Sequence, residues 1–323
     1  MEDYRMDIKA WERMSGLLRE AGAVAAGFAD AGPVPDDETA RYNAMLDAGC
    51  NAGMAYMANH PDVRRDPRLL LDGAKSVVSV AFSFAPPEFR DSEKPMIACY
   101  AYGDDYHDVL RRRLKKVCES MKDEFGGEYR ICIDSAPVHE RYWAEKAGIG
   151  RRLDNGMLAV PGHGCEVFLA EIVTTLQLGE GGEAAAPEDS MEDICLHCGA
   201  CRRACPAGAL GADGVVDARR CLSYLTIEHH GEWTDPVYQE AMAAQEEQKA
   251  LFGCDICLRV CPLNRGLVPT RIEEFQPRRE IMEIDAGDVL EMKQEDFSRI
   301  FARSPIKRAK LAGLQRNCRN LKR

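Results

Sequence analysis

Cysteine is the residue whose spacing in this chain points most directly to chemistry. Eight of the 14 cysteines fall into two runs with a single cysteine between them: Cys195, Cys198, Cys201 and Cys205, then Cys221, then Cys254, Cys257 and Cys261. The first run has the CxxCxxCxxxCP spacing of bacterial proteins with paired clusters, in which the fourth cysteine binds the other cluster. The second run lacks only its first cysteine, which Cys221 can supply. We therefore expect two [4Fe-4S] clusters and the transfer of single electrons.

The same spacing divides the eight thiolates between the two clusters. One cluster would be bound by Cys195, Cys198, Cys201 and Cys261, and the other by Cys205, Cys221, Cys254 and Cys257. Two structural zinc sites would use the same number of cysteines. The three-cysteine loop followed by Cys-Pro favours iron, because it can bind three corners of a cubane cluster from one short segment.

A carboxyl group near the end of a predicted strand is the second candidate. Asp134 belongs to the segment YRICIDS (129–135) and shortly precedes Pro137, where proline ends the strand ladder. Ligands of open α/β sheets bind outside such strand ends. A partly desolvated carboxyl there can have a raised pKa and act as a general acid. Position alone favours a different role, the capping of the following helix.

The remaining cysteines and the histidines show no spacing typical of a metal site. Six cysteines are expected to be ordinary buried or half-buried thiols: Cys50, Cys99, Cys118, Cys132, Cys165 and Cys318. His107 lies near the start of a predicted helix, and His197 lies inside the first cysteine run, where its side chain is expected to point away. His229 and His230 could face a substrate or water, and the residues leave both roles open.

Strands and helices alternate in the first part of the chain, and these elements must position the reactive groups. We expect strands over 76–84, 129–135 and 167–178, and helices over 106–125 and 140–148. Asp104 or Asp105 could cap the first of these helices. The alternation predicts an α/β or α+β layer fold for about the first 180 residues. No GxGxxG or Walker loop is present, so no dinucleotide or nucleoside triphosphate site is expected.

A Gly/Ala/acidic stretch separates this region from the cysteine runs. The segment GEGGEAAAPEDS (179–190) has no apolar period and has the composition of a linker. We expect a first domain over 1–180, a linker over 181–190, a two-cluster domain over 191–270 and a C-terminal helical segment with a basic tail over 271–323.

Charge and hydropathy limit the partners. The net charge of -11 over 323 residues argues mildly against a large nucleic-acid footprint. Residues 303–323 nevertheless contain eight Lys or Arg and no acid, as in a solvated helix face or a contact with phosphate. No segment approaches the roughly 18 apolar residues of a membrane span. The N-terminal residues resemble no export signal, so a cytoplasmic location without a membrane partner is expected.

Several longer motifs resemble those of one enzyme family. The matching segments are GMAYMANHPDVRRDPRLLLDGAKSVVSVAFSF (53–84), YAYGDDYH (100–107), DSAPVHERYWAEKAGIG (134–150), CLHCGACRRACPAGAL (195–210), CLSYLTIE (221–228), GCDICLRVCPLN (253–264) and SPIKRAKLAGLQRN (304–317). Their order along the whole chain is that of epoxyqueuosine reductases, which this chain therefore resembles. The cysteine run alone is shared with any ferredoxin, whereas DSAP with AEKAG, followed by CLSYLTIE, is far more specific.

The resemblance implies an α+β protein: a nitroreductase-like α/β domain that binds base-off cobalamin, then a ferredoxin-like domain with two [4Fe-4S] clusters. The implied activity is reduction of epoxyqueuosine to queuosine at the wobble position of tRNA, with cobalamin reduced through the clusters and Asp134 as proton donor rather than helix cap. Position within the matching motifs places these residues around the corrin: Met57, Cys99, Asp134, Leu158, Leu169 and Ala207. The implied partners are the tRNA anticodon stem-loop carrying epoxyqueuosine and an external one-electron donor such as flavodoxin or ferredoxin.

The chain departs from the family pattern in several places. Only Asn155 remains of a GKN element, CDDCQ becomes CDICL (254–258), and residues 229–252 read as an inserted or extended helix. The chain also reads as a short form without C-terminal helical repeats. The alternatives are a corrinoid iron–sulfur reductase of another substrate, resembling reductive dehalogenases, and an electron-transfer partner protein without substrate chemistry.

Overall fold

The computed structural model describes residues 2–179, 194–211, 214–245 and 249–321, with side chains from Ile8 onward. The expected linker over 181–190 lies outside the described residues. The strands are β1 (Ala25–Asp30), β2 (Ser76–Ser83), β3 (Met96–Ile97), β4 (Tyr129–Cys132), β5 (Arg151–Arg152), β6 (Leu158–Ala159), β7 (Val167–Thr174) and β8 (Ala250–Phe252).

Short helices are numerous and lie mostly in the second half of the chain. The α-helices are α1 (Glu2–Glu20), α2 (Asp36–Asp47), α3 (Pro61–Arg65), α4 (Tyr106–Phe125), α5 (Glu140–Lys146), α6 (Ala200–Ala204), α7 (Leu222–Ile227), α8 (Pro236–Ala243), α9 (Ile256–Arg259), α10 (Arg279–Glu283), α11 (Ala286–Glu291), α12 (Gln294–Ile300) and α13 (Lys310–Leu321). The 3-10 helices are η1 (Ala55–Ala58), η2 (Pro67–Leu70), η3 (Cys99–Ala101), η5 (Pro262–Asn264), η6 (Glu273–Phe275) and η7 (Pro305–Ala309). No described helix has the length and apolar character needed to span a membrane.

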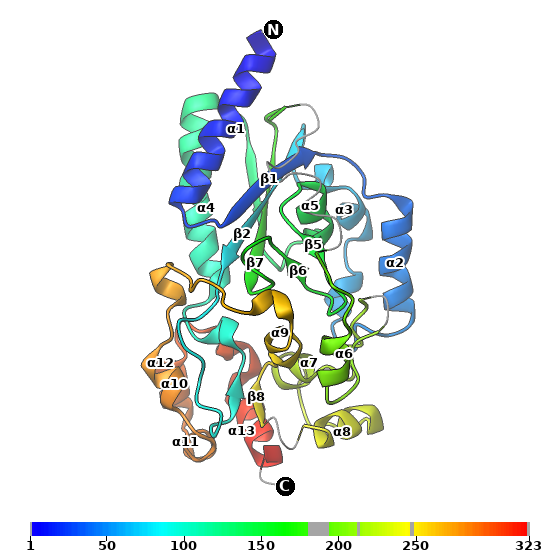
Figure 1. Ribbon diagram of the computed structural model, residues 1–323, viewed down its shortest axis with the longest axis vertical. Coiled ribbons are helices and arrows are strands. Elements are labelled where there is room, and N and C mark those ends of the chain that lie inside the picture. The colour runs from blue at the N-terminus through cyan, green and yellow to red at the C-terminus, as the bar shows by residue number, and fades with distance from the viewer. Residues whose placement is uncertain (1, 180–193, 212–213, 246–248, 322–323) are drawn as a thin grey trace.

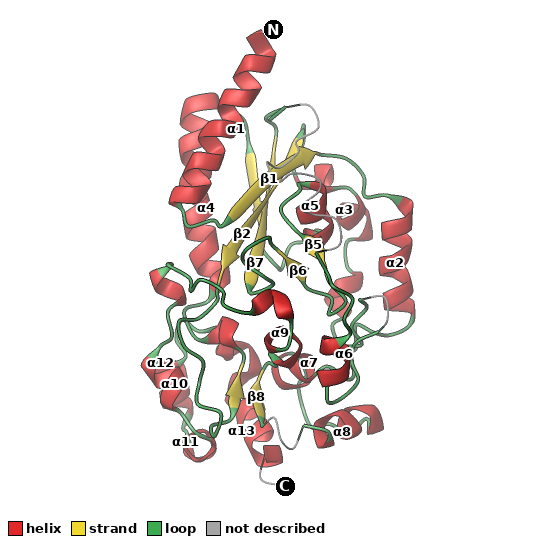
Figure 2. Cartoon of the chain, viewed as in Figure 1, coloured by secondary structure: helices red, strands yellow, loops and turns green. Residues whose placement is uncertain are grey.

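The main sheet has four strands in the order β1-β2-β7-β4, and every neighbouring pair is antiparallel. Figure 2 shows these strands as the yellow arrows between two sets of helices. All eight residues of β2 are buried, which explains its nearly continuous apolar sequence: the strand is central and covered on both faces. The expected α+β class is confirmed. Because β4 is antiparallel to β7, the strand-end rule for parallel sheets does not account for the position of Asp134.

The two faces of the sheet are covered by different helices (Figure 1). On one face α1 and α4 pack their apolar stripes, with Leu18 and Leu114, against Phe82 of β2 and Ile172 of β7. Alternate residues of β7 point to the other face, where α5 covers the sheet with Trp143. The edges of α4 match the predicted helix over 106–125, and Asp105 caps it by accepting from the His107 N–H at 3.0 Å.

The cysteine segment and the C-terminal helices pack against the same core as the N-terminal part. Strand β3 pairs in parallel with β8, which places Ile97 opposite Phe252. Asn317 of α13 donates from its amide to the carbonyls of Leu251 and Thr226, at 2.8 and 2.9 Å. One contiguous apolar cluster includes residues of α1, β2, α4, β8 and α13. The helix expected within 229–252 is present as α8, but it covers only eight residues.

Candidate functional site

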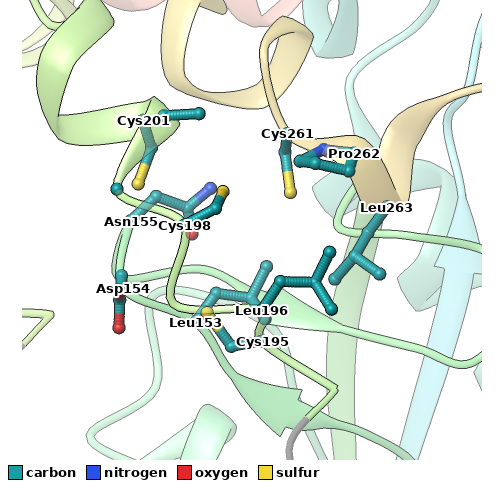
Figure 3. Close-up of a pocket in the computed structure, with 12 residues that line it drawn as sticks. Leu153, Asp154, Asn155, Cys195, Leu196, Cys198, Cys201, Cys261, Pro262 and Leu263 are labelled. Atoms are coloured by element: carbon teal, nitrogen blue, oxygen red, sulfur yellow. The ribbon is translucent and has the colours of Figure 1, made fainter.

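Four cysteines line one pocket at the junction of α6 and α9. Cys195, Cys198 and Cys201 approach it from the loop before α6 and from α6 itself, and Cys261 approaches from the turn after α9. Figure 3 shows the sulfur atoms of Cys198, Cys201 and Cys261 directed into the space between these elements. The structure thus brings together the four cysteines that the spacing assigns to one cluster, with Leu153 and Leu263 on the apolar wall.

The backbone of the first run explains how three cysteines reach one pocket. His197 and Gly199 both have positive φ, +44° and +66°, so the chain turns sharply on either side of Cys198. Glycine has no steric penalty there, whereas histidine is held by its side chain. His197 Nδ1 lies 2.9 Å from Asp154 Oδ1, which ties the loop to the turn after β5. A ring nitrogen of His197, a carboxylate oxygen of Asp154 and the Cys195 sulfur all lie within 4.8 Å of one another, so the His197 side chain lies beside the first cysteine set.

The second set of cysteines is identified by mutual electrostatic effects. Burial raises the pKa of the Cys257 thiol to about 12, and the charges of Cys221 and Cys205 add to that rise. Burial also raises the pKa of Cys254, again with contributions from Cys221 and Cys257. These effects place Cys205, Cys221, Cys254 and Cys257 close together, and such a group needs positive charge from a metal to become four thiolates. The donor set therefore fits a cluster.

Cys165 is a contact that sequence reasoning missed. Its thiol donates to the sulfur of Cys261, and this hydrogen bond is the main reason that the pKa of Cys261 is lowered to about 6. Asn264 Oδ1 accepts from the Cys165 backbone N–H at 2.8 Å and lies 3.3 Å from its sulfur. The position of Gly164 favours glycine, because its φ is +60° and a Cβ there would lie 2.7 Å from the Leu263 carbonyl oxygen. Cys165 is buried, as we expected from the sequence. Its contact with Cys261 was not expected.

Asp134 lies in a tight turn after β4 and does not cap α5. Its φ is +50°, and the Ser135 N–H donates to the Ile133 carbonyl at 2.5 Å, so Asp134 is the centre of a three-residue turn with positive φ. The cap position of α5 is His139, whose side chain makes no capping hydrogen bond. The structural role favoured by position alone is therefore wrong.

The carboxylate of Asp134 faces the first turn of α4. His107 Nε2 lies 3.2 Å from Asp134 Oδ2, and Tyr106 also contributes a side-chain hydrogen bond. Burial raises the pKa of Asp134, but the hydrogen bond and positive charge of His107 outweigh it, so the pKa is lowered overall. The expected rise in pKa is wrong, because the sequence did not show that a histidine from the helix cap segment faces this carboxylate.

Side chains from four separate elements surround Asp134 and still leave 58% of its side chain exposed. Burial is the main reason that the pKa values of Tyr56 in η1 and Tyr100 in η3 are raised. The negative charge of Asp134 adds to both rises. Arg308 of η7 forms an ion pair with Glu228 at 2.8 Å and lowers the pKa of Asp134. The accessible carboxylate thus has aromatic, cationic and imidazole groups around it.

The other residues expected around a corrin lie in several apolar clusters. Leu158 of β6 and Leu169 of β7 pack in one cluster on the α5 side of the sheet. Ala207 packs in another, beside Cys221 and Cys254. Cys99 is buried at the start of η3, and its N–H donates to Asp255 Oδ2 at 2.7 Å, directly beside the second cysteine set. Met57 is half-buried in η1, next to Tyr56.

The basic tail is more than a solvated face. Arg316 is buried, with 4% of its surface exposed, and donates to the carbonyls of Leu225, His229 and Gly231. Its guanidinium also lies 4.4 Å from the centre of the Trp233 ring. Arg316 is therefore structural, whereas Arg308 lies at the site around Asp134.

Two family models match the chain. One, described as "Epoxyqueuosine reductase QueG, DUF1730", matches residues 64–135, and the other, "4Fe-4S double cluster binding domain", matches residues 194–264. The second covers all eight cysteines, the seven of the two runs and the lone Cys221.

Individual relatives match over most of the chain. The epoxyqueuosine reductase of Cyclobacterium marinum is 40% identical over 288 residues, covering 87% of each chain. A crystal structure of epoxyqueuosine reductase with an epoxyqueuosine-modified tRNA-Tyr stem loop is 28% identical, with a TM-score of 0.84 over 98% of this chain and 81% of that chain. The same values describe the similarity to a Bacillus subtilis epoxyqueuosine reductase whose catalytic aspartate loop is swung out of the active site.

Proposed function

We propose that this chain, which belongs to the epoxyqueuosine reductase family, reduces epoxyqueuosine to queuosine at the wobble position of tRNA. The reaction takes up two electrons and two protons, replaces the epoxide with a carbon–carbon double bond and releases the oxygen as water. The observation that best supports this function is the Asp134 carboxylate, which is accessible and hydrogen-bonded to His107. A tRNA substrate is also in keeping with a cytoplasmic enzyme.

The eight cysteines would hold two [4Fe-4S] clusters in the partition given by their spacing. The pocket lined by Cys195, Cys198, Cys201 and Cys261 supports the first set, and the mutual pKa effects around Cys257 support the second. Cys201 also acts on the pKa of Cys257, so the two sets are neighbours. Cys198 is exposed while its partners are half-buried, so we expect an external donor such as flavodoxin or ferredoxin to reduce the first cluster.

Cobalamin would be held by the residues that the family motifs place around it, which belong to three apolar clusters and to η1. Leu158, Leu169 and Ala207 supply apolar surface, Met57 lies beside Tyr56, and Cys99 links this region to the cysteine loop through Asp255. Cobalamin, when bound base-off and reduced, supplies the electrons that remove the epoxide oxygen.

Asp134 would deliver the proton that the leaving oxygen needs. Burial lowers the pKa of His107, but its hydrogen bonds to Asp105 and Asp134 outweigh this and raise the pKa to about 9. At neutral pH the imidazole is therefore protonated and shares its proton with an ionised Asp134. Asp134 can pass this proton to the substrate oxygen, and His107 then restores it.

The side chains around Asp134 also suit a nucleotide. Tyr56 is an exposed aromatic ring that can stack on a base, and Arg308 is a cation that can approach a phosphate. Both interact with the Asp134 charge, so a nucleotide held by them would present its modified ring to the carboxylate.

The test is single-turnover assay of the reconstituted holoenzyme with a reductant and an anticodon stem-loop carrying epoxyqueuosine. Mass spectrometry of the digested RNA should show queuosine in place of epoxyqueuosine. Unchanged epoxyqueuosine, with both clusters and cobalamin loaded, would contradict the proposal. Turnover of an organohalide instead would favour a dehalogenase-like reductase, and reduction of a partner protein alone would favour an electron carrier.

A further inference from the structure

The backbone at Asp134 has a conformation that needs support. A non-glycine residue with a positive φ at the centre of a three-residue turn is strained, and such strain persists only where surrounding contacts fix it. The His107 and Tyr106 hydrogen bonds fix the carboxylate end of the residue. These hydrogen bonds do not hold the Asp134 backbone, which needs a contact with another group.

Glu140 makes that second contact. The Asp134 N–H donates to Glu140 Oε1 at 2.7 Å, from the first residue of α5 back across the turn. Resting on the function proposed above, we infer that Glu140 is a positioning residue: it holds the loop over 133–138 in the conformation that presents Asp134 to the substrate. Glu140 touches neither substrate nor cofactor in this role, and acts through the Asp134 backbone.

The surroundings of Glu140 fix its side chain. It starts α5, which packs Trp143 and Ala144 against the sheet, so the helix cannot follow the loop. Behind it lies Glu171 of β7, whose buried carboxyl oxygens have no hydrogen-bond partner among the described residues. Burial raises the pKa of Glu171, and the charge of Glu140 adds to this rise. The Glu171 carboxyl is thus kept neutral, whereas the Asp134 N–H offers the Glu140 carboxylate a donor at 2.7 Å.

Two substitutions separate the reach of this side chain from its charge. Glu140→Asp keeps an acid at the helix start, where negative charge is favourable, but withdraws the oxygen by about 1.5 Å. Glu140→Gln keeps the reach and an amide oxygen that can accept the N–H, and removes the charge. Glu119→Gln on the exposed side of α4 is the matched control.

The rate of amide hydrogen exchange in the peptide covering 130–139 of the holoenzyme measures how often this loop opens. We expect Glu140→Asp to speed this exchange about tenfold, because the shorter side chain no longer reaches the Asp134 N–H and that hydrogen bond is lost. The same variant should lower kcat about tenfold with unchanged KM for the stem-loop, and Glu140→Gln should stay close to the wild type in both measurements. Both variants should retain full cluster and cobalamin absorbance.

Wild-type exchange in Glu140→Asp would overturn the inference, as would equal acceleration in Glu140→Gln and Glu140→Asp. A failure of the proposed function has a different signature. The wild-type enzyme would then leave epoxyqueuosine unchanged, while the exchange rates of the variants would still decide whether Glu140 holds the loop.

Discussion

His107 Nε2 lies 3.2 Å from Asp134 Oδ2, while His107 Nδ1 lies 2.7 Å from Asp105 Oδ1. One imidazole thus bridges the carboxylate that caps α4 and the carboxylate that follows β4. Because both ring nitrogens face carboxylates, the cationic form of His107 is favoured and both can donate. The cap of a helix is in this way joined to the proposed proton donor.

Asp134→Asn is expected to lower kcat/KM for epoxyqueuosine reduction by about 100-fold or more, because an amide cannot supply the proton. Cluster and cobalamin content, read from the visible absorbance, should be unchanged. Asp108→Asn, an exposed carboxylate on the first turn of α4, is the control and should retain wild-type rates. Full activity in Asp134→Asn would remove this residue from the mechanism.

Stability should depend on the protonation of His107. Its pKa is raised from 6.5 to about 9, so the folded state binds the proton more tightly than the unfolded chain. The stabilisation is complete below about pH 6.5 and is lost as the pH rises through about 9. Because the side chain is 30% exposed, we expect a loss on the order of 2 kcal/mol in the free energy of unfolding.

Anaerobic denaturant titrations at several pH values measure this slope. His107→Gln should abolish it. His139→Gln should leave the slope above about pH 7.5 intact, because burial lowers the pKa of His139 to about 4 and the unfolded side chain is also neutral at that pH. A slope that survives in His107→Gln would have to come from another group.

Cys221→Ser tests the assignment of the lone cysteine. We expect loss of about half of the iron and acid-labile sulfide, because one of two four-iron clusters loses a ligand. Cys118→Ala removes a buried thiol from α4, away from the cysteine runs, and should keep the full iron content. An unchanged iron content in Cys221→Ser would mean that the second cluster takes its fourth ligand elsewhere.

Cys165→Ala should lower the reduction potential of the cluster bound through Cys261. A hydrogen bond to a ligand sulfur stabilises the reduced, more negative cluster, and its loss is worth on the order of 40 mV for about 1 kcal/mol. Redox titration followed by electron paramagnetic resonance measures the shift. Cys165→Ser retains a donor and should lie closer to the wild type than Cys165→Ala. Equal potentials in all three proteins would exclude this contact as a tuning element.

Local patterns in the sequence were enough where structure depends on neighbours along the chain. The helix over 106–125 and its Asp105 cap were predicted because the apolar period and the cap residue lie within one segment. The short pair β3 and β8 was not predicted, because two or three residues carry no period and their pairing depends on distant segments.

The pKa shifts in the site could not be predicted from the sequence, because they also depend on contacts between distant segments. Asp134 was a candidate by position and by family motif, but its lowered pKa follows from His107, which lies on another element. A histidine two residues after a capping aspartate was the available signal. Cys165 stood alone in the sequence, and only the fold places it against Cys261.

The pairing of β3 with β8 bears on how the protein matures during synthesis. Ile97 and Leu314 belong to one apolar cluster, so the core of the N-terminal half is complete only when α13 packs against it. The two cysteine runs, which we propose bind iron, lie between Ile97 and Leu314 in the chain. We therefore expect cluster binding and closure of the core to depend on each other during folding.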